Sequence, residues 1–501
     1  MPSVRVGRIT TSTCSTSRET NAINMTVPTS HGKHRGQKCV AAVRQHWPPR
    51  AIFLVLLLAG SVTADKLEIN MGGTTGNNGR ILDRKFVGKG AFDQVPFGAE
   101  SINDTSEYAL GSYTHNILFI QDNQPRDLDD SDHPKASETE CDMLNCGMVH
   151  WTADMLETRK QRVEEAISFW NEESLSRHHP AAQLEITVNF ANDVYNNGDP
   201  FTVDDIGDGS SSTGFIDALS QIDSDYGQNT SFSTATRHFN DDTRRDLNSH
   251  WAFTTFIKPY RGRASASING PYTKGYEDDP NWTYAHELGH VFGARDEYGS
   301  HETDERSGYL YSYNTNAAYL PGGEEHNPDS VRALMKSHGS YFISDGANDA
   351  IGWRDTDADT IPDILDTIPT ITTDIGGSQP SDGLFHAIVD ATVTPLPSPD
   401  PNEGDFTINT LTSAQYRVDR ELWTDLLPLD NSFGDYLEQF EIERSFSSLG
   451  HHRIDFRLYN SVGNYVDHRF MFTAVPEAST LAIGIIMFLG SVHRRTRALA
   501  T

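Results

Sequence analysis

The apolar positions of residues 154–170, "DMLETRKQRVEEAISFW", fall on one face of a helix. Leu156, Val163 and Ile167 recur at the 3.6-residue period of an amphipathic α-helix. Asp154 stands three residues before Glu157, which is the spacing of a capping box. The pattern therefore predicts a helix that begins at Asp154 and packs one side against a core.

The next segments switch between strand and helix patterns. Apolar and polar residues alternate in "QLEITVNF", residues 183–190, which predicts a half-buried strand. A second helix is expected around Phe215–Ile222, and further strands are expected at Trp251–Ile257 and Ala264–Gly270. Strands that alternate with helices are typical of an α/β layer arrangement. We therefore expect an α/β domain over residues 141–354.

The residues before this domain have no sustained pattern. Residues 65–140 are rich in Gly, Asn and Asp, and "NILFI" (Asn116–Ile120) is their single strand-like piece. A pro-segment or an N-terminal extension fits such a composition, and the sequence does not choose between them.

The C-terminal part carries short strand patterns separated by turn residues. In "HHRIDFRLYN", Ile454, Phe456 and Leu458 alternate with charged residues. After a linker at 367–382, residues 383–474 are therefore expected to form an all-β sandwich. This segment resembles bacterial immunoglobulin-like or fibronectin-like domains, which implies a spacer or binding module.

Composition and charge narrow the function classes. The chain has 501 residues, a hydrophobic content of 37% and a formal net charge of −30. Such an acidic surface repels phosphate backbones, so we expect no nucleic-acid partner, whereas divalent cations are favoured. Residues 1–64 are basic and contain the apolar run Ala51–Gly60 before a small-residue site. They are expected to be a leader with a signal peptide, so the protein is expected to be exported.

The C-terminal tail also has the composition of a targeting segment. Residues 475–501 contain a Val-Pro-Glu element, an apolar stretch and three arginines. The tail resembles the bacterial PEP-CTERM sorting signal, although Ala478 stands where that signal has a second proline. The resemblance implies an exosortase partner and attachment to the cell surface or outer envelope. A simple membrane anchor is the alternative.

Two cysteines, Cys141 and Cys146, remain beyond the leader. In an oxidising compartment a local disulfide between them is the default expectation. The alternative is a pro-segment thiol that occupies a metal site.

The stretch "HELGHVFGARDEY" places several metal-binding side chains close together. On a helix, His286 and His290 are four residues apart, so both imidazoles project from one face toward one point. Such spacing suits two corners of a tetrahedral zinc site, with Glu287 near enough to act on a water as general base. The plain alternative is a helix that happens to carry two histidines.

The residues after the second histidine extend this pattern. Gly293 can adopt a left-handed conformation that ends the helix and turns the chain back, which brings Asp296 toward the same metal. The resulting HExxHxxGxxD pattern resembles the metzincin clan of zinc proteases, in the snapalysin-like form with an aspartate as third ligand. Glu297 is the neighbouring alternative, and a glutamate from "SHETDERSG" (Glu302 or Glu305) would indicate another protease class.

The resemblance implies further site residues. Metzincins have a Met-turn below the zinc, and Met335 in "SVRALMKSHG" is the candidate for it. Tyr298 and Tyr341 are candidates for a tyrosine that assists the oxyanion, and neither is assigned. The implied fold is a twisted sheet with an active-site helix.

The segment "DTDADTIPDILD", residues 355–366, has the ligand spacing of a calcium loop. Five aspartates occupy offsets 1, 3, 5, 9 and 12: Asp355, Asp357, Asp359, Asp363 and Asp366. Thr360 stands where such loops have glycine. The segment resembles thrombospondin type 3 and dockerin-type calcium loops, and a solvated acidic turn is the alternative.

Together these patterns predict an exported zinc endopeptidase that hydrolyses protein or peptide substrates with Glu287 as general base. The alternative is a calcium-dependent surface adhesion or matrix protein with an inactive protease domain.

Overall fold

The computed structural model describes residues 95–123, 126–127, 146–147, 150–206, 214–228, 231–326, 331–371, 384–448 and 450–474. The expected leader, the sorting tail and the disulfide, which needs the side chain of Cys141, lie outside these residues and stay predictions. Within the described ranges, no helix is both long and apolar enough to cross a membrane.

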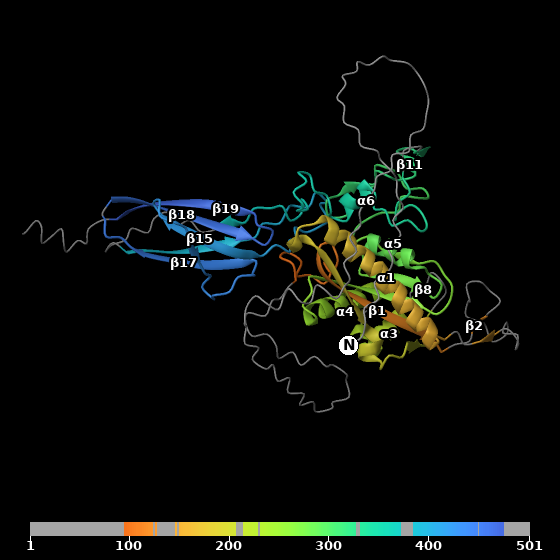
Figure 1. Ribbon diagram of the computed structural model, residues 1–501. Coiled ribbons are helices and arrows are strands. Elements are labelled where there is room, and N and C mark those ends of the chain that lie inside the picture. The colour runs from red at the N-terminus through yellow and green to blue at the C-terminus, as the bar shows by residue number, and fades with distance from the viewer. Residues whose placement is uncertain are drawn as a thin grey trace, which may run out of the picture. The chain divides into compact units, whose positions relative to one another are not determined.

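A six-stranded mixed sheet organises the first half of the described chain (Figure 1). Its strands, from one edge to the other, are β4 (Leu184–Phe190), β1 (Gly111–Asp122), β6 (Trp251–Lys258), β8 (Tyr272–Tyr276) and β7 (Ser265–Ala266), with β5 (Phe201–Val203) also paired to β1. The pairs β1–β4, β1–β5, β1–β6 and β6–β8 are parallel, and only β7 runs antiparallel to its neighbour. The class of this half is therefore α/β.

The strand β1 corrects the expected domain boundary at residue 140. It contains "NILFI" and lies between β4 and β6, with Ile117 opposite both Phe190 and Thr255. The strand β1 is consequently part of the α/β sheet. Removing residues 65–140 as a pro-segment would remove β1. The sheet would then lose a central strand, which pairs in parallel with strands much further along the chain.

Each face of the sheet has its own core, since side chains alternate along a strand. Tyr113, Ile117 and Phe119 of β1 pack with helices α1 (Ala153–Arg177) and α5 (Asn281–Val291). The opposite face carries the helices α2 (Ala191–Tyr195), α3 (Phe215–Ile222) and α4 (Phe232–Asp246). Figure 1 shows α1 running beside α5.

Two local expectations in this half are wrong. The helix α1 begins at Ala153, because the Thr152 hydroxyl caps it by accepting from the amide of Met155 at 3.2 Å, so Asp154 is not the cap. The expected strand at 264–270 shrinks to Ser265–Ala266, since Asn269 adopts a left-handed φ of 49° that ends extended pairing.

The remaining short elements follow the helix α5 and precede the C-terminal part. Four two-residue strands form two hairpin-like pairs: β9 (Arg306–Ser307) with β10 (Ser312–Tyr313), and β11 (Tyr319–Leu320) with β12 (Glu324–Glu325). A further pair joins β2 (Arg126–Asp127) and β3 (Cys146–Gly147). The helix α6 (Asp345–Ala350) and the 3-10 turns at Pro180–Ala182 and Tyr226–Gln228 complete the helical elements described.

Two antiparallel sheets form the C-terminal part (Figure 1). One contains β13 (Thr370–Ile371), β14 (Leu384–Thr392) and β17 (Leu437–Ser445), and the other contains β16 (Thr424–Leu426), β15 (Leu411–Val418), β18 (Gly450–Asn460) and β19 (Tyr465–Ala474). Ile454, Phe456 and Leu458 are fully buried, as their alternation predicts, and share one core with Phe440 and Ile442. The fold class of this part is therefore all-β.

Candidate metal centre

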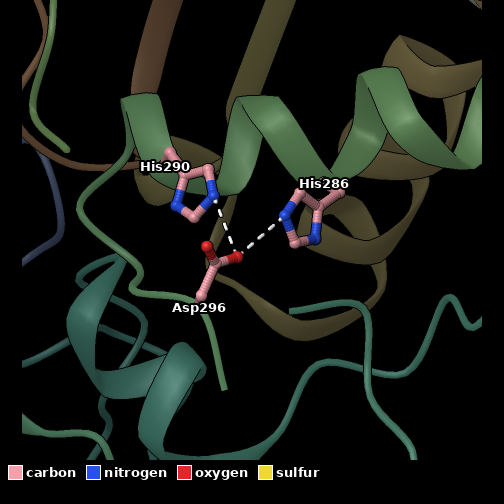
Figure 2. A group of neighbouring side chains, drawn as sticks. All are labelled: His286, His290 and Asp296. Carbon is pink, nitrogen blue, oxygen red and sulfur yellow. Dashed lines mark ion pairs between the residues drawn. The ribbon is translucent and has the colours of Figure 1, made fainter. Parts of the chain in front are cut away.

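The helix α5 positions the two histidines. Every residue from Tyr284 to Val291 is buried, and the indole of Trp170 on α1 donates to the carbonyl of Ala285 at 3.0 Å. This contact fixes the helix against α1. His286 and His290 project from one side of α5, with ring centroids 4.8 Å apart and ring planes at 88° (Figure 2).

A turn at Gly293 brings a carboxylate back to these rings. Gly293 has a φ of 108°, and a Cβ added there would lie 2.7 Å from the Cα of Gly308. No side chain fits such a position, which is why the sequence needs glycine at this point. Beyond the turn, Oδ1 of Asp296 lies 3.1 Å from Nε2 of His286 and 3.3 Å from Nε2 of His290 (Figure 2).

The other ring nitrogens point at backbone carbonyls. Nδ1 of His286 lies 2.9 Å from the carbonyl of Leu334, and Nδ1 of His290 lies 2.8 Å from that of Ala294. A carbonyl can only accept, so each Nδ1 carries the proton and donates it. In the neutral imidazoles, the lone pairs of both Nε2 atoms then face the carboxylate oxygen of Asp296. These three hydrogen-bond acceptors repel one another unless a cation lies among them.

The geometry and chemistry of these three donors fit zinc. Bonds of 2.0–2.1 Å in a tetrahedral zinc site separate neighbouring ligand atoms by about 3.3 Å. The two nitrogen-to-oxygen separations measured around Asp296 match this value. In addition, Asp296 Oδ1 is buried and accepts no well-aligned hydrogen bond from the described residues. His286, His290 and Asp296 are thus suited to hold a zinc ion.

The electrostatics of the three side chains also favour a positive charge at this point. Burial on its own raises the pKa of Asp296, but the adjacent imidazoles of His286 and His290 outweigh it and hold that pKa well below its usual range. Burial likewise lowers the pKa of His286, yet the carboxylates of Asp296 and Glu287 and the Leu334 carbonyl raise it overall. A proton is stabilised where a metal ion would lie.

Glu287 lies next to this group without joining it. Its side chain is 6% exposed, and its Oε2 is buried without a hydrogen-bond partner among the described residues. Burial raises the pKa of Glu287 above its usual value, against the opposing effect of the two histidines. A raised pKa makes a carboxylate a stronger base, which suits a group that accepts a proton.

The alternative third ligands contact other groups. The carboxylate of Glu297 is fully buried and accepts hydrogen bonds from the Ser344 hydroxyl and, at 2.6 Å, from the Asn316 amide. Glu302 accepts from the amide of Gly322, and Glu305 lies 2.7 Å from Nδ1 of His301. Asp296 is therefore the carboxylate that the structure brings to the two histidines.

Met335 packs beneath the helix that carries the histidines. It is 2% exposed, and a Cβ added to Gly289 would lie 2.6 Å from its Sδ, so Gly289 provides the space for the thioether. Its carbonyl accepts from the amide of Glu297 at 2.9 Å, and its neighbour Leu334 accepts from His286. The segment around Met335 thus supports both His286 and the turn that carries Asp296.

A cavity of about 570 Å³ opens beside His286 and Glu287. Tyr298 lines it, with its hydroxyl 3.3 Å from the Arg263 guanidinium, whereas Tyr341 instead packs against Phe169 with ring centroids 4.9 Å apart. The sequence patterns missed the polar and aromatic residues that line the cavity because they come from separate segments without a shared period. These residues are Arg263, Asp278, Asp279, Trp282, Lys336 and His338.

The Asp loop is only partly assembled as a cation site. Ligand oxygens of Asp355, Asp357 and Asp359 lie within 4.8 Å of one another. Asp363 instead pairs with Arg354 at 2.6 Å, and Asp366 accepts from the Asn464 amide at 2.7 Å. Thr360, at the position where calcium loops have glycine, adopts a left-handed φ of 79°. The loop backbone thus takes a glycine-like turn, and calcium binding here stays a prediction.

Comparisons with known proteins add little to this geometry. No family model and no curated protein matches the chain. Among solved structures, wild-type OgpA from Akkermansia muciniphila matches with a TM-score of 0.20 and 10% identity over 74% of this chain and 94% of that one. Catalytically inactive OgpA in complex with an O-glycopeptide substrate matches with a TM-score of 0.15 and 10% identity over the same shares of the two chains. An engineered protein matches with a TM-score of 0.15 and 10% identity over 64% of this chain and 70% of that one. These TM-scores are too low to establish a common fold.

Proposed function

We propose that this protein is a zinc-dependent endopeptidase, secreted or held at the cell surface, that hydrolyses peptide bonds in protein or peptide substrates. The observation that carries the proposal is that Asp296 Oδ1 lies 3.1 and 3.3 Å from Nε2 of His286 and His290, beside Glu287, whose buried Oε2 has no hydrogen-bond partner among the described residues. Two bare imidazole nitrogens, a carboxylate and a free base in a cavity are the parts that metal-assisted hydrolysis needs.

Each residue has a separate task in this proposal. Zinc, when bound, supplies a Lewis acid that acidifies water and polarises a carbonyl. His286, His290 and Asp296 hold it, and the Leu334 and Ala294 carbonyls fix both imidazoles with Nε2 directed at the centre. Glu287 accepts a proton at its carboxylate and later donates it to the leaving amine, a role that its raised pKa favours.

The cavity beside Glu287 is the candidate substrate site. It is lined by Arg263 and Tyr298 and by Trp282 and His338, whose rings meet edge to face with their centroids 4.8 Å apart. An aromatic wall and polar groups at the edge suit an extended polypeptide, whose amides need hydrogen bonds and whose side chains need apolar contact.

The proposal is tested by comparing the chain with its Glu287→Gln variant on unfolded casein, with zinc measured in parallel. The variant keeps the three metal-holding residues, so about one zinc per chain should remain, whereas the cleavage rate should fall on the order of 10²–10⁴-fold. Glu164→Gln, on the exposed face of α1, is the matched control and should cleave like the wild type.

Zinc without cleavage in the wild type would favour the adhesion or matrix protein, in which the protease domain is inactive. Absence of zinc from the wild-type chain would overturn the metal centre itself. Equal cleavage by the wild type and Glu287→Gln would remove Glu287 from the role of base.

A further inference from the structure

Three carboxylates gather where the turn between β16 and β17 of the all-β part meets β17. One ligand oxygen from each of Asp430, Asp435 and Glu438 lies within 4.8 Å of the others. Asp430 and Asp435 are exposed to solvent, whereas Glu438 is 5% exposed. The cluster therefore has a buried floor and an open mouth, through which a hydrated ion could enter.

Backbone hydrogen bonds hold this turn in place. The amide of Leu429 donates to the carbonyl of Gln439 at 2.8 Å, which joins the start of the turn to β17. The amide of Gly434 donates to the carbonyl of Leu411, and the amide of Leu411 donates back to the carbonyl of Asp435, each at 2.9 Å. The two exposed aspartates are thus carried by a segment that is anchored to both sheets.

The burial of Glu438 distinguishes this cluster from a group of surface acids. Its Oε1 is buried and has no hydrogen-bond partner among the described residues. Its strand pairs it with Ala391, whose side chain offers no donor. Burial, together with repulsion from Asp430 and Asp435, raises the pKa of Glu438 to about 7, although a backbone hydrogen bond from Asp435 acts in the opposite direction. Within the described ranges, no Lys, Arg or His forms an ion pair with these three residues. Burying a carboxylate beside two others is costly unless a cation compensates the charge.

We propose that Asp430, Asp435 and Glu438 bind a divalent cation, for which Ca²⁺ is the best fit. All three donors are hard carboxylate oxygens with no nitrogen or sulfur ligand, which favours Ca²⁺ over zinc. The open mouth leaves room for the water ligands that a coordination number of 6–8 requires. The bound ion joins the turn to β17, so the cation stabilises the all-β part. The site is distinct from the metal centre on α5 and does not depend on protease activity.

The test is calorimetric titration of Ca²⁺ into the full chain after treatment with EGTA and addition of one equivalent of zinc. Glu438→Gln and Asp430→Asn should each bind one Ca²⁺ fewer per chain than the wild type, or bind it at least tenfold more weakly. Glu443→Gln changes an exposed residue of the same strand, β17, and is the matched control that should bind like the wild type. Asp357→Asn, in the Asp loop, should leave this binding event intact.

Thermal unfolding provides the second readout. Ca²⁺ should raise the Tm of the wild type and of Glu443→Gln by more than it raises that of Glu438→Gln. In EGTA, Glu438→Gln should melt no lower than the wild type, because it no longer buries an uncompensated carboxylate. Because Asp430 lies on the exposed turn, Asp430→Asn keeps the test valid if Glu438→Gln does not fold. The inference is overturned if both variants keep the wild-type stoichiometry and affinity, or if Asp357→Asn alone abolishes all Ca²⁺ binding.

Discussion

The neighbouring acids Asp296 and Glu297 offer the sharpest prediction about the metal centre. Both are candidate third ligands by position, yet only Asp296 faces the histidines, at 3.1 and 3.3 Å. Glu297 is fully buried against Ser344 and Asn316. Asp296→Ala should therefore weaken zinc binding, whereas Glu297→Gln should weaken the fold.

The two substitutions should change different quantities, namely the zinc affinity in Asp296→Ala and the folding stability in Glu297→Gln. Structural zinc sites with four ligands bind with about 10–16 kcal/mol, or about 2.5–4 kcal/mol per ligand. Losing Asp296 should therefore weaken zinc affinity on the order of 10²–10³-fold. Glu297→Gln removes a charged partner from two buried hydrogen bonds, which costs about 1–3 kcal/mol of folding stability. In a domain of this size that lowers the Tm by several degrees.

Competition with a fluorescent zinc chelator measures the affinity, and calorimetric melts measure the stability. The expected result is a large loss of affinity in Asp296→Ala with little change in the Tm of the zinc-free protein, and the reverse in Glu297→Gln. If a folded Glu297→Gln loses zinc while Asp296→Ala keeps it, the assignment of the third ligand is wrong.

Two further predictions concern pH and packing. Burial, and to a smaller extent repulsion from Glu403, raises the pKa of Glu107 well above its ordinary value of 4.5. The folded state therefore keeps this proton at pH values where the unfolded state has lost it, and the free energy of unfolding falls as the pH rises above 4.5. Glu107→Gln should therefore raise the Tm more at about pH 9 than at about pH 5, and an equal change at both would contradict this. Gly289→Ala places a Cβ 2.6 Å from the Sδ of Met335, which should cost about 1–3 kcal/mol of stability by overpacking. Thermal melts check this change. In Gly339→Ala the added Cβ would meet nothing within 4 Å, but the backbone is left-handed, so any loss of stability there reports backbone strain and not packing.

Local sequence patterns were sufficient to predict those features that depend only on residues close together in the chain. The spacing of His286 and His290 places both rings on one helix face, and the need for glycine at 293 follows from a turn that only positive φ allows. The alternation in β18 likewise predicted that Ile454, Phe456 and Leu458 are buried, because a strand inverts the side-chain direction at every residue. Asp455 on the opposite face is also buried, because it pairs with arginines of the neighbouring strands, Arg417 and Arg469.

Other features needed the tertiary structure. The sequence alone does not place β1 in the sheet, because nothing in its short apolar run shows that β4 and β6 pair with it from either side. Sequence could not choose between Asp296 and Glu297, since a single residue along a turn decides which side chain points inward. The acids at 430, 435 and 438 carry no recognised spacing, and only the anchored turn brings their oxygens together. The sequence by itself thus determined the helix that presents the two histidines and the class of each part, since periodicity is local. The tertiary structure decided which distant strands and carboxylates meet, because long-range contacts depend on the packing of the whole chain.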